Sequence, residues 1–228
     1  MNTTHSLIAK KSIAATAIGL LALIGNVAQA QVATDSLNGW SVSGDAVSQA
    51  GAITLTTAYL DGGSGEPSNL SGQSAADIGA LESAAGVALY GLDLSPEEYG
   101  TEGSLVGQSF AAMAGDTLSF DWSFSTLETL FQDRAFVVID GEVFTLATLS
   151  APGAATQSFS YTFAQGGNAT LSFGVIDTVD YLGVSSLSVS NLQLVSAVPE
   201  PTTTALMLAG LGLVGAATAR TRRRTGTR

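Results

Sequence analysis

Carboxylates dominate the chemistry available between residues 31 and 198, where all of the 19 acidic residues except Glu200 lie. Asp177 and Asp180 stand three residues apart, just before Gly183. Together with turn carbonyls they could supply the hard oxygen ligands that calcium prefers. No EF-hand or nonapeptide repeat accompanies them, so a solvated acidic loop is the alternative. The sequence assigns no metal or cofactor and leaves calcium open.

A facing pair of carboxylates could instead hydrolyse a glycosidic bond, a mechanism that needs no His. The candidate pairs are Glu97 with Glu98 and Asp116 with Asp121. Acids this close in sequence usually face solvent and not each other. We therefore expect no catalytic residue and no enzyme, and a secreted glycosidase is the least favoured reading.

Missing residue types exclude other mechanisms. There is no Cys, which excludes disulfides, thiol nucleophiles and Cys-based metal centres. The single His, His5, lies near the N-terminus, so no Ser–His mechanism is available after it. The sequence pI of about 4.2 argues against nucleic-acid partners. Arg134, the one basic residue between 31 and 198, is expected to pair with an acid such as Asp133 or Asp140, or to donate to loop carbonyls.

The N-terminus has the pattern of a secretory signal peptide. Lys10 and Lys11 precede an apolar run over residues 12–27, and Ala28 and Ala30 form a small-x-small cleavage site. This pattern predicts a signal helix over residues 1–30 that signal peptidase removes. An uncleaved membrane anchor is the alternative, but the run is short for a full span.

The C-terminus has three parts in order. Pro199, Glu200 and Pro201 form a stiff extended segment. Residues 202–219 carry no charge and, as a helix of about 27 Å, would nearly match a hydrocarbon core of about 30 Å. The sequence predicts a transmembrane helix there. An arginine cluster then holds the tail in the cytoplasm: Arg220, Arg222, Arg223 and Arg224.

The run VPEPTTTALMLAGLGLVGAATARTRRR resembles the PEP-CTERM sorting signal of Gram-negative bacteria, also catalogued as an ice-binding-protein-like C-terminal domain. The resemblance covers about the last 30 residues. It implies recognition by an exosortase, a membrane-embedded cysteine protease or transpeptidase. It also implies export, a transient inner-membrane anchor with the domain outside, and final placement at the cell surface or outside the cell. Such proteins accompany exopolysaccharide and biofilm genes. An ordinary single-span anchor is the alternative.

Residues 31–197 read as one all-β domain, an antiparallel β-sandwich. Leu118, Phe120, Trp122 and Phe124 alternate with polar residues, and 159–163 and 171–175 repeat this period of two. The shared parity places Trp122 in the core and not on a sugar-stacking platform. Asp140-Gly141 predicts a hairpin turn, and the change of parity at Ser190-Asn191 predicts a bulge.

A Gly- and Ser-rich loop over residues 61–75 interrupts the strands. Ser74 and Asp77 predict a capping box that starts a short helix ending near Gly86, and Ser95-Pro96-Glu97-Glu98 predicts a further helical turn. This insertion is long for a hairpin loop, so we expect it to cover one end of the sandwich.

The stretch from Thr101 through Phe120 to Val137 resembles an ectodomain recurrent in PEP-CTERM proteins, with a jelly-roll or carbohydrate-binding-module-like appearance. The sequence therefore predicts an exported surface or matrix protein sorted by an exosortase and associated with exopolysaccharide. The main alternative is a carbohydrate-binding module without catalysis. Both leave extracellular polysaccharide as the expected partner.

Overall fold

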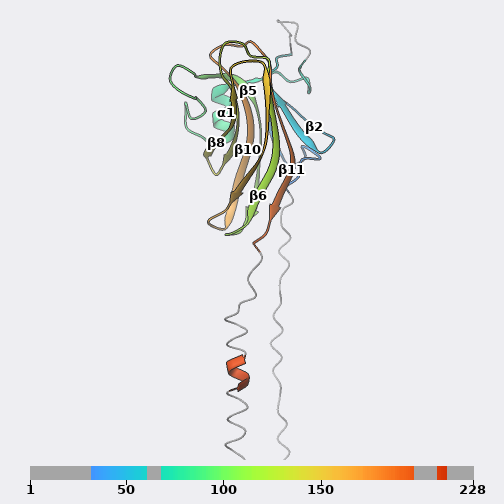
Figure 1. Cartoon of the computed structure of the whole chain (residues 1–228), viewed down its shortest axis with the longest axis vertical. Helices are drawn as coiled ribbons and strands as arrows, with labels where there is room; N and C mark the ends of the chain where they lie inside the picture. The colour runs from blue at the N-terminus through green and yellow to red at the C-terminus, as the bar shows by residue number, and fades with distance from the viewer. Residues whose placement is uncertain (1–31, 61–67, 198–209, 215–228) are drawn as a thin grey trace, which may run out of the picture.

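Two antiparallel β-sheets pack face to face in the computed structural model, which describes residues 32–60, 68–197 and 210–214 (Figure 1). Sheet A has the order β1-β5-β10-β7-β8, with β4 also pairing with β5, and sheet B has the order β2-β3-β11-β6-β9. The strands are β1 (Ser41–Ser43), β2 (Asp45–Gln49), β3 (Ala52–Thr56), β4 (Ala76–Asp77), β5 (Gly100–Ala112), β6 (Thr117–Thr126), β7 (Asp133–Ile139), β8 (Glu142–Leu149), β9 (Gly153–Thr162), β10 (Gly167–Thr178) and β11 (Ser185–Val195).

The chain crosses repeatedly from one sheet to the other, at β5–β6, β6–β7, β8–β9, β9–β10 and β10–β11. The long strands thus form two layers, β5-β10-β7-β8 over β3-β11-β6-β9, which is a jelly-roll arrangement. The prediction of an all-β antiparallel sandwich is confirmed. Two of the crossings, β6–β7 and β10–β11, carry the acidic residues described below.

Alternation along the strands builds the core between the sheets. Phe120 on β6 and Phe173 on β10 meet edge to face, with ring centroids 4.8 Å apart, and Phe120 also stacks on Phe159 of β9. Trp122 is buried, as its parity predicts, and Trp40 packs against Phe173. Because these rings exclude water from most of the interior, the sandwich is stabilised chiefly by apolar burial.

Two local predictions are confirmed by the backbone. Asp140 and Gly141 have φ values of 51° and 81°, so a tight turn with two left-handed residues joins β7 to β8 and pairs Ile139 with Glu142. The pairing of β11 with β6 shifts between Ser190 and Gln193, and this bulge switches the strand's parity.

The helix of the insertion lies elsewhere than expected. Helix α1 (Ile78–Ala85) packs on the outer face of sheet A, beside β5, and not over an end of the sandwich (Figure 1). Beneath it is a second apolar cluster: Leu81, Ala85, Leu92, Leu105, Phe136, Val138 and Ile176. The outward residues of β5, β7 and β10 are apolar here, so this face needed a cover. Sheet A is therefore buried on both faces where α1 lies over it.

The predicted capping box is wrong. Asp77 caps α1 by accepting a hydrogen bond from the Gly79 N–H at 2.9 Å, and the Ser74 hydroxyl accepts from the Leu60 N–H instead. The helix ends at Gly86 in the left-handed conformation, as expected. The predicted helical turn at Ser95 does not continue as a helix: the Glu98 N–H donates to the Ser95 carbonyl at 3.1 Å, but the Leu94 N–H donates back to the Glu98 carbonyl at 3.0 Å, which closes a single turn.

The predicted signal helix over residues 1–30 lies outside the described residues. Of the predicted transmembrane segment 202–219, only residues 210–214 are described, and these are helical. Within the described part of the chain, no helix has both the length and the apolar character required to span a bilayer.

Candidate functional site

Three neighbouring strands of sheet A each place one acid at the same end of the sandwich interior. Glu102 on β5, Asp177 on β10 and Asp133 on β7 have the parity of the inward core residues of their strands. All three are at most 2% exposed. The apolar interior therefore ends in a row of buried carboxylates.

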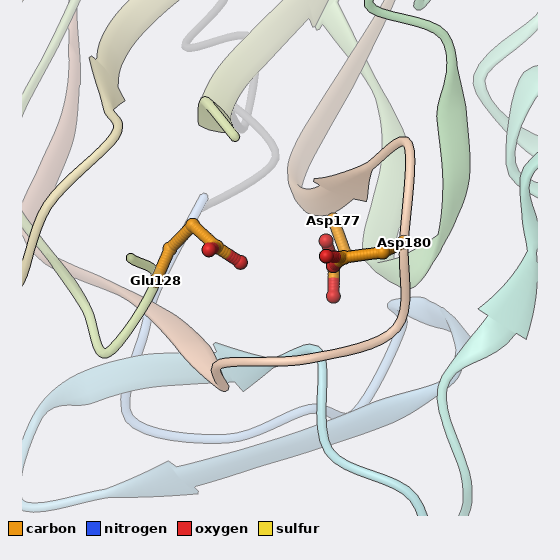
Figure 2. A group of neighbouring side chains, drawn as sticks. All are labelled: Glu128, Asp177 and Asp180. Carbon is orange, nitrogen blue, oxygen red and sulfur yellow. The ribbon is translucent and has the colours of Figure 1, made fainter. Parts of the chain in front are cut away.

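Two loop residues complete this acidic cluster. Asp180 follows β10 in the β10–β11 loop, and Glu128 lies in the β6–β7 loop. One carboxylate oxygen from each of Glu128, Asp177 and Asp180 lies within 4.8 Å of the others. Figure 2 shows the Glu128 carboxylate facing those of Asp177 and Asp180 from the opposite loop. The sequence indicated Asp177 and Asp180, and the fold adds Glu128 to them.

The β6–β7 loop holds Glu128 by its own backbone. The Thr126 hydroxyl accepts from the Glu128 N–H at 2.8 Å, and Glu128 Oε1 accepts from the N–H groups of Thr129, Leu130 and Phe131. Glu128 Oε2, by contrast, is buried and has no hydrogen-bond donor in the described structure. The side chain is thus fixed through one oxygen and leaves the other available.

The β10–β11 loop is held from β5. The Thr101 hydroxyl lies 2.7 Å from the carbonyl oxygen of Asp180 and 3.1 Å from that of Asp177. Asp180 Oδ1 accepts from the Leu182 N–H at 3.0 Å, whereas Asp177 Oδ1 is buried and, within the described part of the chain, has no donor. This arrangement fixes the backbone around both acids, and the Asp177 carboxyl is also hydrogen-bonded to that of Asp133.

Gly183 lets the two loops touch. Its φ is +73°, and a Cβ there would lie 2.7 Å from Glu128 Cα and 3.1 Å from Glu128 Oε2. Any larger residue would push the β10–β11 loop away from the β6–β7 loop.

The electrostatics of the cluster oppose full ionisation. Burial raises the pKa of Glu102 to about 7. Burial, reinforced by the carboxylates of Asp133 and Glu102, also raises the pKa of Asp177. Asp133 has its pKa raised by burial, although the Ser185 hydroxyl donates to its Oδ2 at 2.5 Å. Buried carboxylates in this state favour either shared protons or a bound cation.

Arg134 does not neutralise the cluster, although it follows Asp133 directly. It lies on the outward face of β7, where its guanidinium donates to the Leu92 carbonyl at 2.9 Å and to the Thr145 hydroxyl at 2.7 Å. Donation to a loop carbonyl matches one of the predicted structural roles, and the predicted pairing with Asp133 or Asp140 is not found. Burial lowers the pKa of Arg134.

Neither candidate glycosidase pair is arranged for catalysis. Asp116 is buried and accepts from the N–H groups of Met113 and Ala197, both at 2.9 Å. Asp121 accepts from Ser158 and Asn191 on the outer side of sheet B, and these hydrogen bonds lower its pKa. Glu97 is exposed, and Glu98 accepts from Gln132. Each of these acids has a local structural partner or faces solvent.

Open cavities lie on the surface of the described part of the chain. One, of about 560 Å³, is lined by Tyr90, Asp93, Ser95, Pro96 and Tyr99, and both tyrosines are exposed. Another, of about 490 Å³, lies between the end of α1 and sheet A, and its lining includes Gln108, Asp140, Thr170 and Ser172. The first combines aromatic rings with a few polar groups, as small-molecule sites do.

The remaining predicted site residues belong to the two ends of the chain. The cleavage-site residues Ala28 and Ala30 lie outside the described residues, as do Pro199, Glu200, Pro201 and the arginine cluster. Residues 197–224 match the family model of the PEP-CTERM protein-sorting motif. The chain carries a PEP-CTERM sorting signal. This signal implies export and sorting by an exosortase during membrane transit.

Three of the solved structures similar to the sandwich are carbohydrate-binding domains with 11–13% sequence identity to this chain. The match to a CBM4 structure covers 72% of this chain and 98% of the CBM4 chain, at 13% identity and a TM-score of 0.36. The N-terminal cellulose-binding domain of β-1,4-glucanase C from Cellulomonas fimi covers 72% and 93%, at 11% identity and a TM-score of 0.36. TmCBM61 in complex with β-1,4-galactotriose covers 72% and 92%, at 11% identity and a TM-score of 0.34. No curated protein matches the chain.

Proposed function

We propose that this chain is an exported surface or matrix protein that an exosortase sorts through its PEP-CTERM signal, and whose sandwich acts outside the cell beside extracellular polysaccharide without catalysis. The observation that carries this proposal is the match at residues 197–224. The match contains Pro199, Glu200 and Pro201, then the uncharged segment 202–219, then the arginine cluster. The cleavage pattern at Ala28 and Ala30 supports entry into the export route.

Mass spectrometry of the exported protein tests the sorting step. In a strain with an active exosortase, the exported wild-type protein should lack peptides that contain Arg222. A Pro199→Ala/Glu200→Ala variant should keep those peptides and stay in the membrane fraction. Glu142→Gln, an exposed acid on β8, is the matched control and should be sorted normally. Recovery of Arg222-containing peptides from exported wild-type protein would contradict the proposal.

A carbohydrate-binding role is the second candidate, and the cavity with Tyr90 and Tyr99 favours it. Tyr90 is 72% exposed and Tyr99 is 46% exposed, so both rings are accessible for stacking, and Asp93 and Ser95 could accept or donate hydrogen bonds.

A glycan array followed by affinity electrophoresis tests this role. Tyr90→Ala and Tyr99→Ala should each weaken retention on the polysaccharide that the array identifies. Tyr181→Ala, which removes another exposed tyrosine outside the cavity, should leave retention unchanged. Equal losses from all three variants, or no ligand on the array, would refute the assignment of this cavity.

A further inference from the structure

We propose that Glu128, Asp177 and Asp180 bind one divalent cation, with calcium preferred, and that the ion ties the β6–β7 loop to the β10–β11 loop. Their oxygens lie within 4.8 Å of one another, which is close enough for a single ion to contact all three. The proposal is independent of the sorting signal, and its test does not involve the exosortase.

A buried orphan oxygen indicates a ligand beyond the acids themselves. Glu128 is 1% exposed, yet its Oε2 has no hydrogen-bond donor in the described structure. Asp177 is 2% exposed and its carboxyl is hydrogen-bonded to that of Asp133, which requires a proton between two acids. The carboxylates of both residues face each other across the two loops (Figure 2). A buried carboxylate oxygen without a partner is costly, and a cation at this point would satisfy it.

The charge balance supports the same conclusion. Glu102 and Asp133 lie behind the three ligands, so five carboxylates gather at this end of the interior. Arg134, the one basic residue between 31 and 198, faces the other side of sheet A. Only protons or a bound cation can therefore offset this charge from within the sandwich.

The donor set selects a hard cation. The three ligands are carboxylates, and neither His nor Cys occurs after His5 to offer a softer donor. Calcium accepts irregular sets of carboxylate, carbonyl and water oxygens, whereas magnesium requires near-octahedral geometry and keeps most of its waters. A site made of two separate loops therefore suits calcium, which tolerates irregular coordination, better than it suits magnesium.

The position of the site gives the ion a structural consequence. The β6–β7 loop leads from sheet B to sheet A, and the β10–β11 loop leads back from sheet A to sheet B. Thr101 on β5 fastens the second loop, and Gly183 allows it to touch Glu128. An ion held by both loops would therefore close this end of the sandwich and stabilise both crossings together.

Calorimetric titration of the full exported chain with calcium chloride, after treatment with EDTA, tests the proposal. We expect one binding event, with magnesium weaker. Thermal unfolding should show a rise in Tm of about 5–10 °C when free calcium is 100-fold above its Kd. Glu128→Gln and Asp180→Asn should each weaken calcium binding at least tenfold and reduce the rise in Tm.

Asp121→Asn is the matched control, since it removes one half-buried acid that is hydrogen-bonded on the outer side of sheet B, away from the cluster, and it should bind calcium as the wild type does. Absence of heat and of any Tm change in the wild-type chain would overturn the proposal and leave proton sharing as the state of the acids. Equal effects of calcium on the wild type and on Glu128→Gln would overturn it as well. Asp180→Asn keeps the side-chain oxygen that accepts from the Leu182 N–H, so the local fold of this loop is preserved. A loss of calcium binding in this variant therefore reports on the ligand and not on folding.

Discussion

The middle and the acidic end of the sandwich interior are built by the same strands and differ in what they bury. On β10, Phe173 and Val175 face the core, and Asp177 continues the same parity. On β7, Ala135 follows Asp133 in the same way. The backbone therefore buries whatever side chain stands at an inward position. The middle needs no partner, whereas the acidic end needs either shared protons or a bound cation to offset its charge.

The largest expected effect on the free energy of unfolding comes from a substitution in the apolar middle of the interior. Phe173→Ala removes a fully buried ring that contacts Phe120 and Trp40, and should lower the free energy of unfolding by about 3–5 kcal/mol. Urea unfolding followed by tryptophan fluorescence measures this loss. Val195→Ala, at an exposed position, should change the same quantity by less than about 0.5 kcal/mol. A loss below about 1 kcal/mol for Phe173→Ala would show that the ring is not central to the core.

A smaller effect is expected where the two acidic loops meet. Gly183→Ala adds a Cβ 2.7 Å from Glu128 Cα at a φ of +73°, and should cost about 1–3 kcal/mol and weaken calcium binding. Gly51→Ala is the control, because Gly51 has a φ of +80° and nothing within 4 Å of its added Cβ. Urea unfolding and calorimetry should show a loss of calcium affinity for Gly183→Ala alone. Similar calcium affinity in both variants would mean that contact between the loops does not shape the site.

The smallest effect concerns pH. Burial raises the pKa of Glu102 from 4.5 to about 7, and Asp133, Asp180 and Asp77 raise it further in the same direction. The folded state therefore holds this proton to higher pH than the unfolded state. Its stabilising contribution is complete below about pH 4.5 and is lost as the pH rises through about 7.

Measured in EDTA, this loss should amount to about 1 kcal/mol for Glu102, because part of the shift belongs to the neighbouring carboxylates that titrate together with it. Urea unfolding at a series of pH values gives the slope, and Glu102→Gln should flatten it. A stability that rises between pH 5 and 7, or a slope that Glu102→Gln leaves unchanged, would contradict the assignment.

Local patterns in the sequence predicted the strands and the turns well, because strands and turns both depend mainly on residues that are neighbours in the sequence. The alternation around Phe120 follows from the period of a strand, and the turn at Asp140 depends on two residues that tolerate positive φ. The place of α1 was not predictable in this way. Its apolar side indicates that it covers something, but only the apolar outward residues of β5, β7 and β10 decide what it covers.

The acidic site was predictable in part. Asp177 and Asp180 are close in sequence, and Asp133 could have been found as an acid in the inward parity of a strand of apolar residues. Glu128 lies in a loop without periodicity, 49 residues before Asp177, and only the crossing between sheets brings it there. The Ser74 cap failed because the same hydroxyl accepts from Leu60, a contact that depends on how the loop folds back.

The hydrogen bond from Ala197 to Asp116 sets how the sorting signal leaves the folded domain. Ala197 is the first residue of the matched segment, and the turn before β6 fastens its backbone at 2.9 Å. Pro199 follows only two residues after this fastened point of the chain. An exosortase that cuts at this motif while the domain is folded would therefore have to accommodate the turn before β6 close to its own active site.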